Sequence, residues 1–150
     1  MNIMPTLEGG LAIEPESNTD WAVLEMITHD VGRPAHLAES LAGLMDDDSD
    51  WEEYVVPDLE LNFNSQCKYV AAVIAEAREY DERAIYIKPV NADKWYGAIN
   101  QARISLEARY KLEAVEDVDE APAELRSAHF RNRFYLMLQS MLLEYVMGEI

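Results

Sequence analysis

The stretch from Phe134 to Met147 is apolar at nearly every position, with only Gln139, Ser140 and Glu144 as polar interruptions. A helix of this composition has no continuous polar face, and such helices lie in a core or against another chain. The stretch is too short and too interrupted to cross a bilayer. It therefore predicts a C-terminal helix that is either central among the other helices or at an oligomer interface.

Apolar residues recur at helical spacing through most of the remaining chain, and Gly and Pro fall mainly at the joints between segments. Ser17 and Asp20 have the spacing of an N-terminal capping arrangement. We expect helices that begin near Ser17, at Pro34, at Asn64 or Ser65, and at Asn91 or Asp93. The last of these runs to about Tyr110, and Pro122 begins a final helical region.

Two short apolar stretches, 11–13 and 84–87, are bounded by Gly or Pro residues and are candidate strands. Neither is long enough to be stable alone, so we expect them to pair with each other. A chain of 150 residues most simply forms one domain. The sequence thus predicts a mainly α single domain over residues 1–150, a compact bundle of five or six helices with at most a short two-stranded β element.

Negative charge is concentrated in the first half of the chain. Residues 1–67 contain fifteen Asp and Glu but a single basic residue, Arg33, whereas residues 68–150 contain fourteen acids and eleven bases. With a net charge of −17, the chain repels phosphate backbones and anionic membranes and attracts basic proteins or cations. Nucleic acids and membranes are therefore not expected as partners.

The cellular compartment is inferred from three features. Cys67 is the only cysteine, so no internal disulfide can form, and its position on an apolar helical stripe predicts a buried thiol with a raised pKa. No run of eighteen apolar residues occurs. The N-terminus lacks the basic-then-apolar order of a secretory signal. The sequence predicts a soluble cytoplasmic protein.

Candidate metal and catalytic motifs fail on spacing. Asp46, Asp48 and Asp50 match the first ligands of an EF-hand loop, but Trp51 and Pro57 stand where that loop requires Gly and Glu. The histidines, His29, His36 and His129, have no partners at zinc-ligand spacing. Nucleophile-elbow, phosphate-loop and dinucleotide fingerprints are also lacking. We therefore predict no catalytic residues, no metal ligands and no cofactor.

The predicted fourth helix carries the most specific local pattern. Asn100, Arg103 and Glu107 follow one another at steps of three and four, so they share one flank beside the apolar stripe, and Arg103 can pair with Glu107. Small residues at 97, 98 and 102 would let another helix approach closely. Asn100 and Arg103 either satisfy polar groups at a helix interface or form a binding site for a ligand or partner.

Residues 95–109 read as an aromatic followed by Gly-Ala-x-Asn-x-x-Arg-x-x-Leu and a further Arg, and residues 135–142 contain Leu-Gln-x-x-Leu. In these segments the chain resembles the bacterial proteins grouped as the domain of unknown function DUF2017. The matching residues are Trp95, Gly97, Ala98, Asn100, Arg103, Leu106, Arg109, Leu138, Gln139 and Leu142. Residues 10–13 are similar to the family's strand-like start.

One departure is Glu107, which stands where that family often has Gly, so we expect the helix to continue there. The resemblance implies no catalytic residues. In some bacteria such proteins are encoded beside the adaptor that feeds substrates to the Clp protease. The resemblance therefore implies a link to proteolysis or its regulation.

The leading functional hypothesis is a non-enzymatic interaction or regulatory protein whose acidic surface engages a basic partner. The candidate binding residues are Asp46, Asp47, Asp48, Asp50, Glu52 and Glu53, with Asn100 and Arg103 as a second contact. One alternative is a small enzyme or regulator that uses acidic oxygens to bind a divalent metal. Another is an acidic mimic of nucleic acid that inhibits a DNA-binding protein. Self-association through the C-terminal helix is a further expectation.

Overall fold

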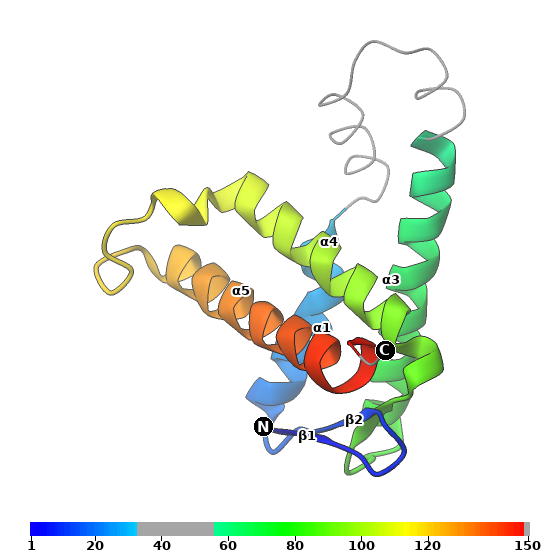
Figure 1. Cartoon of the computed structure of the whole chain (residues 1–150). Helices are drawn as coiled ribbons and strands as arrows, with labels where there is room; N and C mark the ends of the chain where they lie inside the picture. The colour runs from blue at the N-terminus through cyan, green and yellow to red at the C-terminus, as the bar shows by residue number, and fades with distance from the viewer. Residues whose placement is uncertain (33–55, 149–150) are drawn as a thin grey trace.

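A computed structural model describes residues 1–32 and 56–148 of the chain (Figure 1). The elements follow in the order β1 (Asn2–Pro5), β2 (Leu11–Glu14), α1 (Asn18–Val31), α3 (Val56–Glu79), β3 (Ile85–Ile87), α4 (Ala92–Tyr110) and α5 (Ala123–Leu142). A π-helical turn, Leu143–Met147, follows α5. The described part is mainly helical, as predicted. It contains four α-helices instead of five or six, and the helix predicted at Pro34 lies outside the described residues.

Helix α4 connects the helical part of the fold, because it packs against α1, α3 and α5 (Figure 1). Its buried residues lie on several sides of the helix: Ala92, Trp95, Ala98, Ile99, Gln101, Ala102 and Leu106. Of the two positions predicted for the C-terminal helix, the central one is therefore occupied by α4 in the described residues, and an oligomer interface stays a prediction. Helix α5 buries one side, which includes Tyr135, Leu138 and Leu142, and leaves Phe130 and Met137 exposed on another.

The small residues of α4 explain why this helix takes the central position. Ala98 and Ala102 are fully buried, which confirms the predicted close approach of neighbouring helices. At Gly97 an added Cβ would collide with the side-chain amide of Gln66 from α3. Gln66 uses this space to accept a hydrogen bond from the Gln101 amide at 2.8 Å. Each of these positions thus brings a neighbouring element closer than a larger side chain would permit.

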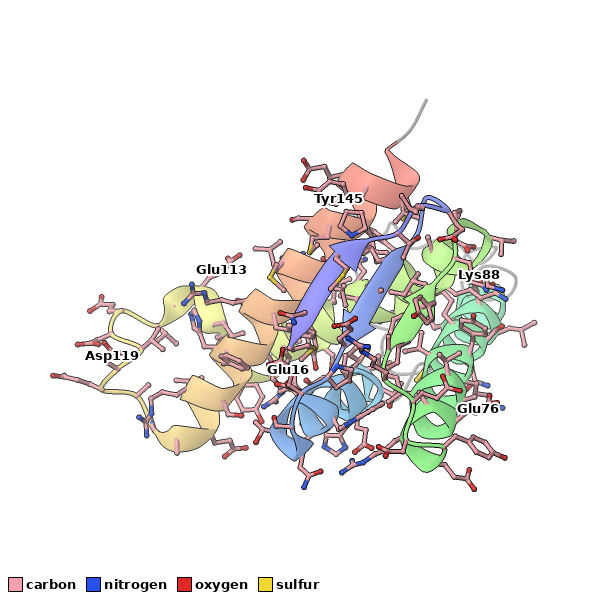
Figure 2. The ribbon with its side chains drawn as sticks, turned by 90° about the horizontal axis from the view of Figure 1, so that it is seen from below. Glu16, Glu76, Lys88, Glu113, Asp119 and Tyr145 are labelled. Carbon is pink, nitrogen blue, oxygen red and sulfur yellow. The ribbon has the colours of Figure 1, made fainter. Side chains whose placement is uncertain are left out.

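The sheet has three antiparallel strands in the order β1-β2-β3, so the prediction of at most two strands is wrong. The expected pairing of residues 11–13 with 84–87 is confirmed, with Ile13 opposite Ile85 and Leu11 opposite Ile87. Figure 2 shows the sheet lying across the helices, and its buried face carries these four side chains. At Gly10 an added Cβ would collide with the backbone oxygen of Ile87, so glycine lets β2 and β3 approach.

Strand β1 has no clear signal in the sequence, because only four residues of mixed character pair with β2. The connection to β2 is a tight turn in which Thr6 N–H donates to the Gly10 carbonyl at 2.9 Å. Gly9 adopts φ of +86°, a backbone conformation that favours glycine. The strand therefore forms through its turn and its partner strand, not through its own periodicity.

The start of α1 is confirmed as a cap. Ser17 Oγ accepts from the Asp20 N–H at 3.2 Å, and Asp20 accepts from the Glu16 N–H at 2.9 Å. The latter bond lowers the pKa of Asp20. The start of α3 differs from the prediction, because this helix begins at Val56 and includes the positions predicted to cap it, 64 and 65. Pro57 lies in its first turn, where a missing N–H costs no intrahelical hydrogen bond.

The remaining helix predictions hold. Helix α4 has Asn91 as its N-cap residue and ends at Tyr110, and α5 follows Pro122 and is continuous through residue 127. Within residues 1–32 and 56–148, none of the helices combines the length and apolar character needed to cross a membrane.

Candidate functional site

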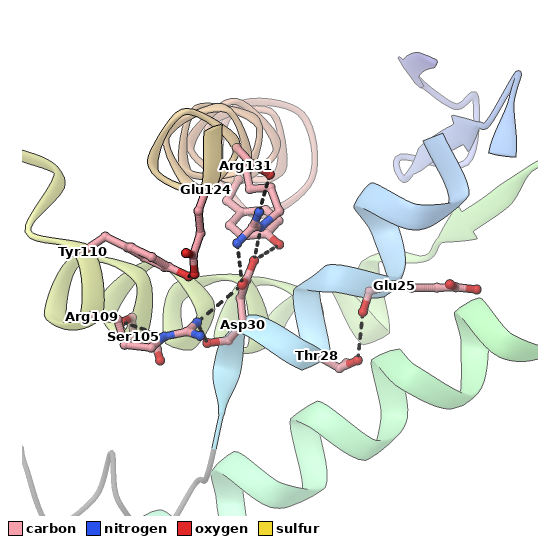
Figure 3. A network of polar contacts seen from close by, with 10 residues as sticks. Glu25, Thr28, Asp30, Ser105, Arg109, Tyr110, Glu124 and Arg131 are labelled. Atoms are coloured by element: carbon pink, nitrogen blue, oxygen red, sulfur yellow. Dashed lines mark hydrogen bonds and ion pairs between the residues drawn. The ribbon is translucent and has the colours of Figure 1, made fainter. Parts of the chain in front are cut away.

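A buried carboxylate, Asp30, lies in the last turn of α1 and has no exposed surface. Arg131 of α5 binds it through two hydrogen bonds, from Nε to Oδ2 at 2.7 Å and from Nη2 to Oδ1 at 3.1 Å. Tyr135, one helical turn later, donates its hydroxyl to Oδ2 at 2.6 Å. Both carboxylate oxygens are thus occupied by donors from α5 (Figure 3).

Arg109 of α4 closes the same cluster from a second side (Figure 3). Its Nη2 donates to the backbone oxygen of Asp30 at 2.9 Å and lies 3.4 Å from Oδ1. Arg131 also donates from Nη1 to Ser127 Oγ at 2.7 Å. One carboxylate therefore links α1, α4 and α5, and we name Asp30, Arg109, Arg131 and Tyr135 the Asp30 cluster.

The electrostatics of the Asp30 cluster favour a structural role. The Asp30 carboxylate raises the pKa of the Arg131 guanidinium, so this arginine stays charged. Burial, and then the hydrogen bond to Asp30, raise the pKa of Tyr135 well above its usual range, so this phenol stays protonated. Arg131 and Tyr135 therefore both keep their protons at neutral pH.

A second polar network joins α4 to α5 near the protein surface. Arg103 Nη1 donates to Gln139 Oε1 at 2.6 Å, and Gln139 Nε2 donates to Asn100 Oδ1 at 3.4 Å. Beside this network lies a groove of about 670 Å³. Its polar lining consists of Asn100, Arg103, Glu107, Glu113, His129, Asn132 and Arg133. We name this the α4–α5 groove.

The predicted flank of Asn100, Arg103 and Glu107 is confirmed, because all three side chains line the α4–α5 groove. The predicted pair between Arg103 and Glu107 does not form within the described residues. Glu107 instead accepts a hydrogen bond from the backbone N–H of Glu113 at 3.3 Å, and Arg103 turns toward Gln139. The sequence left two roles open for Asn100 and Arg103, a helix-interface contact or a binding site. Both roles are compatible with the structure, because these residues join α4 to α5 and also line the groove.

The structure describes some, but not all, of the other residues singled out in the sequence. The candidate binding residues Asp46, Asp47, Asp48, Asp50, Glu52 and Glu53 lie outside the described residues, as does His36. His29 is exposed, whereas His129 lines the groove. Cys67 is half-buried, and burial raises the pKa of its thiol as predicted. In the parts of the chain that the structure describes, no three His, Cys, Asp or Glu side chains are grouped to hold a metal ion.

The Asp30 cluster was missed by sequence reasoning, although the sequence contains a signal for it. Asp30 falls on the same helical stripe as Ile27 and Val31, and Arg131 falls between Ala128 and Tyr135 on the buried side of α5. A charge on an apolar stripe must find a partner when that stripe is buried. One acid and one base on two such stripes therefore predict an interior ion pair.

We expect Asp30→Asn to lower the free energy of unfolding by about 3–5 kcal/mol, because it leaves the Arg131 guanidinium buried without a counter-charge. Urea denaturation at neutral pH measures this change. The matched control is Glu25→Gln, which removes the exposed pair with Arg78 at 2.6 Å and is expected to cost less than about 1 kcal/mol. Equal losses for the two variants would contradict the structural role of Asp30.

We also expect stability to fall above pH 10, the ordinary pKa of a tyrosine. The unfolded chain then loses phenolic protons that folded Tyr135 retains, so each such group lowers the free energy of unfolding by about 1.4 kcal/mol per pH unit. Tyr135→Phe is expected to reduce this slope. The slope does not vanish, because burial of Tyr69 and the hydrogen bond from Tyr110 to Glu124 raise those pKa values too. Urea midpoints between pH 9 and pH 11 measure the slope, and an unchanged slope in the Phe variant would contradict the assignment.

No protein-family model, curated protein or solved structure matches this chain. The resemblance to DUF2017 proteins over residues 95–109 and 135–142 therefore stays a prediction.

Proposed function

We propose that this protein is a non-enzymatic interaction or regulatory protein that binds a basic partner through its acidic surface. The observation that carries the proposal is an acidic loop between α4 and α5. Residues 112–122 of this loop contain five acids and no base, and a sixth acid follows in the first turn of α5: Glu113, Glu116, Asp117, Asp119, Glu120 and Glu124. All six side chains are exposed.

The acidic loop stands away from the packed helices. Figure 1 shows the connection between α4 and α5 extending beyond the helical layer, and Figure 2 shows Glu113 and Asp119 at that end of the molecule. The chain leaves α4 through Lys111, which adopts φ of +50° and ends the helix. A carboxylate-rich loop in this position can reach a partner without displacing other parts of the fold.

A charged surface of this kind acts mainly on the rate and selectivity of encounter. Opposite charge raises association rates over distances comparable to the Debye length, and added salt removes the effect. With a net charge of −17, the chain as a whole adds to the attraction exerted by the loop. The acidic run at residues 46–53 adds six carboxylates to this proposal. The DUF2017 resemblance favours the Clp protease machinery as the first partner to test.

We expect partner capture from native lysate at about 0.05 M salt and its loss at about 0.5 M. Replacing Glu116, Asp117, Asp119 and Glu120 by their amides is expected to weaken binding of the captured partner about tenfold or more. The same replacement of Asp46, Asp47, Asp48 and Asp50 tests the second acidic segment.

The matched control removes the same number of charges at the end of α3, where Glu76, Glu79, Asp81 and Glu82 are exposed. Biosensor binding with the purified partner gives the affinity of each variant. Binding that persists at high salt would contradict the proposal of a localised acidic surface. Binding that falls equally in the loop variant, the 46–50 variant and the α3 control would contradict it too.

Self-association is a second proposal about partners. The side of α5 that faces β1 and α1 carries Phe130 and Met137, which are 62% and 46% exposed. Beside them, a groove of about 480 Å³ between β1, α1 and α5 is lined partly by Phe134 and Met141. Large apolar side chains gathered on one face favour contact with another protein surface.

We expect the purified protein to be dimeric by light scattering coupled to size exclusion, and Met137→Glu to shift it to the monomer. The control is Leu61→Glu on α3, which places the same charge at a side chain that is 70% exposed and lies away from this face. A wild-type chain that is monomeric at every concentration would rule out this dimer.

A further inference from the structure

Arg103 has hydrogen-bonding capacity that the described residues leave unused. Arg78, Arg109 and Arg131 each pair with a carboxylate, whereas Arg103 forms no ion pair in the described part of the chain. Only its Nη1 donates, to Gln139, and its Nε is buried without a hydrogen-bond partner. A guanidinium has five N–H donors, and unmade hydrogen bonds at a half-buried site are costly. Nε is closed off from the groove, so Nη2, which makes no hydrogen bond to the described residues, is the donor that Arg103 offers to an acceptor there.

A second donor, the amide nitrogen of Asn100, follows from the direction of the hydrogen bonds next to Arg103. Because Arg103 can only donate, it selects the oxygen of the Gln139 amide, which is 3% exposed. Gln139 then presents its nitrogen to Asn100 Oδ1, which leaves Asn100 Nδ2 as a donor on the exposed wall of the groove. Two donors, a guanidinium and an amide, therefore lie side by side on α4 with their orientation set by a buried glutamine.

The size and apolar lining of the α4–α5 groove favour an organic ligand. Its volume of about 670 Å³ is within the range of sites for small molecules. Ile104, Ala108, Leu112 and Leu136 form its apolar lining, and Ile104 and Leu136 are 38% and 47% exposed. A ligand that meets the two donors with one end can cover these side chains with an apolar body.

The charges along the groove limit the charge of the ligand. Arg103 and Arg133 line the groove together with Glu107 and Glu113, so the formal charges of these four residues cancel. Around them, a chain of net charge −17 repels multiply charged anions. A single negative charge can pair with the Arg103 fork without placing a second charge near the two glutamates.

We propose that the α4–α5 groove binds a small organic monocarboxylate. The carboxylate pairs with Arg103 Nη2 and with Asn100 Nδ2, and the apolar body lies along Ile104, Ala108 and Leu136. This site is separate from the exposed acids of the loop, although Glu113 borders both. A small probe on the purified protein therefore tests it without reference to any protein partner.

The test uses three probes with the same aromatic body: 2-naphthoate, 2-naphthyl phosphate and the neutral 2-naphthalenemethanol. We expect saturable binding of 2-naphthoate by titration calorimetry, with weaker binding of the dianion and of the alcohol. Arg103→Gln is expected to raise the Kd of 2-naphthoate about tenfold or more. Arg126→Gln is the matched control, because it removes the same charge from an exposed position on α5 that does not line the groove.

A second variant keeps the test independent of the contact between Arg103 and Gln139. Ala108 is exposed on α4, so Ala108→Trp fills the groove while the core stays unchanged, and we expect it to abolish 2-naphthoate binding. Urea denaturation verifies that each variant is folded. Equal binding of the alcohol and the carboxylate, or unchanged binding in both Arg103→Gln and Ala108→Trp, would overturn the site. Tighter binding of the phosphate would overturn the assignment to a monocarboxylate.

Discussion

A carboxylate that has lost contact with water must find its hydrogen bonds within the protein, and Asp30 finds them on two other helices. Arg131 and Tyr135 come from α5, and Arg109 comes from α4. These bonds fix the end of α1 against both partners in a single orientation, because a bidentate pair has little angular freedom. The arrangement of α1, α4 and α5 therefore depends on one directional contact inside a mainly apolar core.

The two polar networks that involve α4 and α5, one of them through Asp30 of α1, differ in how completely they are satisfied. In the Asp30 cluster both carboxylate oxygens have donors, and the phenol that contacts them is fully buried. In the network beside the groove, Gln139 is almost fully buried but Asn100 is exposed and Arg103 keeps unused donors. Complete satisfaction favours rigidity, and incomplete satisfaction at a surface favours recognition. The same pair of helices thus contributes a structural contact at one site and a candidate binding site at another.

The sequence predicts the helical elements well where periodicity is strong. The bounds of α4 and the capped start of α1 follow from local residues, as does the pairing of β2 with β3. Local residues do not predict strand β1 or the early start of α3, because these depend on a turn and on packing between distant segments. The identity of the central helix also escapes prediction, since apolar content alone makes α5 look more buried than α4.

The candidate groove is also predictable only in part, because some of its features depend on local periodicity and others on packing between distant segments. The positions of Asn100, Arg103 and Glu107 on one flank follow from helical geometry. The choice between Glu107 and Gln139 as the partner of Arg103 does not, because it depends on where α5 lies. Glu107 is also engaged by the backbone N–H of Glu113, a contact created by the turn after α4.

The Asp30 cluster contains two guanidinium groups and one carboxylate, so it carries one positive charge in excess. Arg109 is 41% exposed, so water screens much of this excess, and a surrounding field of opposite sign stabilises the remainder. The acidic exterior of this chain supplies such a field. The acidic surface then stabilises the fold in addition to any effect on partner binding. The carboxylates that face solvent help to hold two arginines at the junction of three helices.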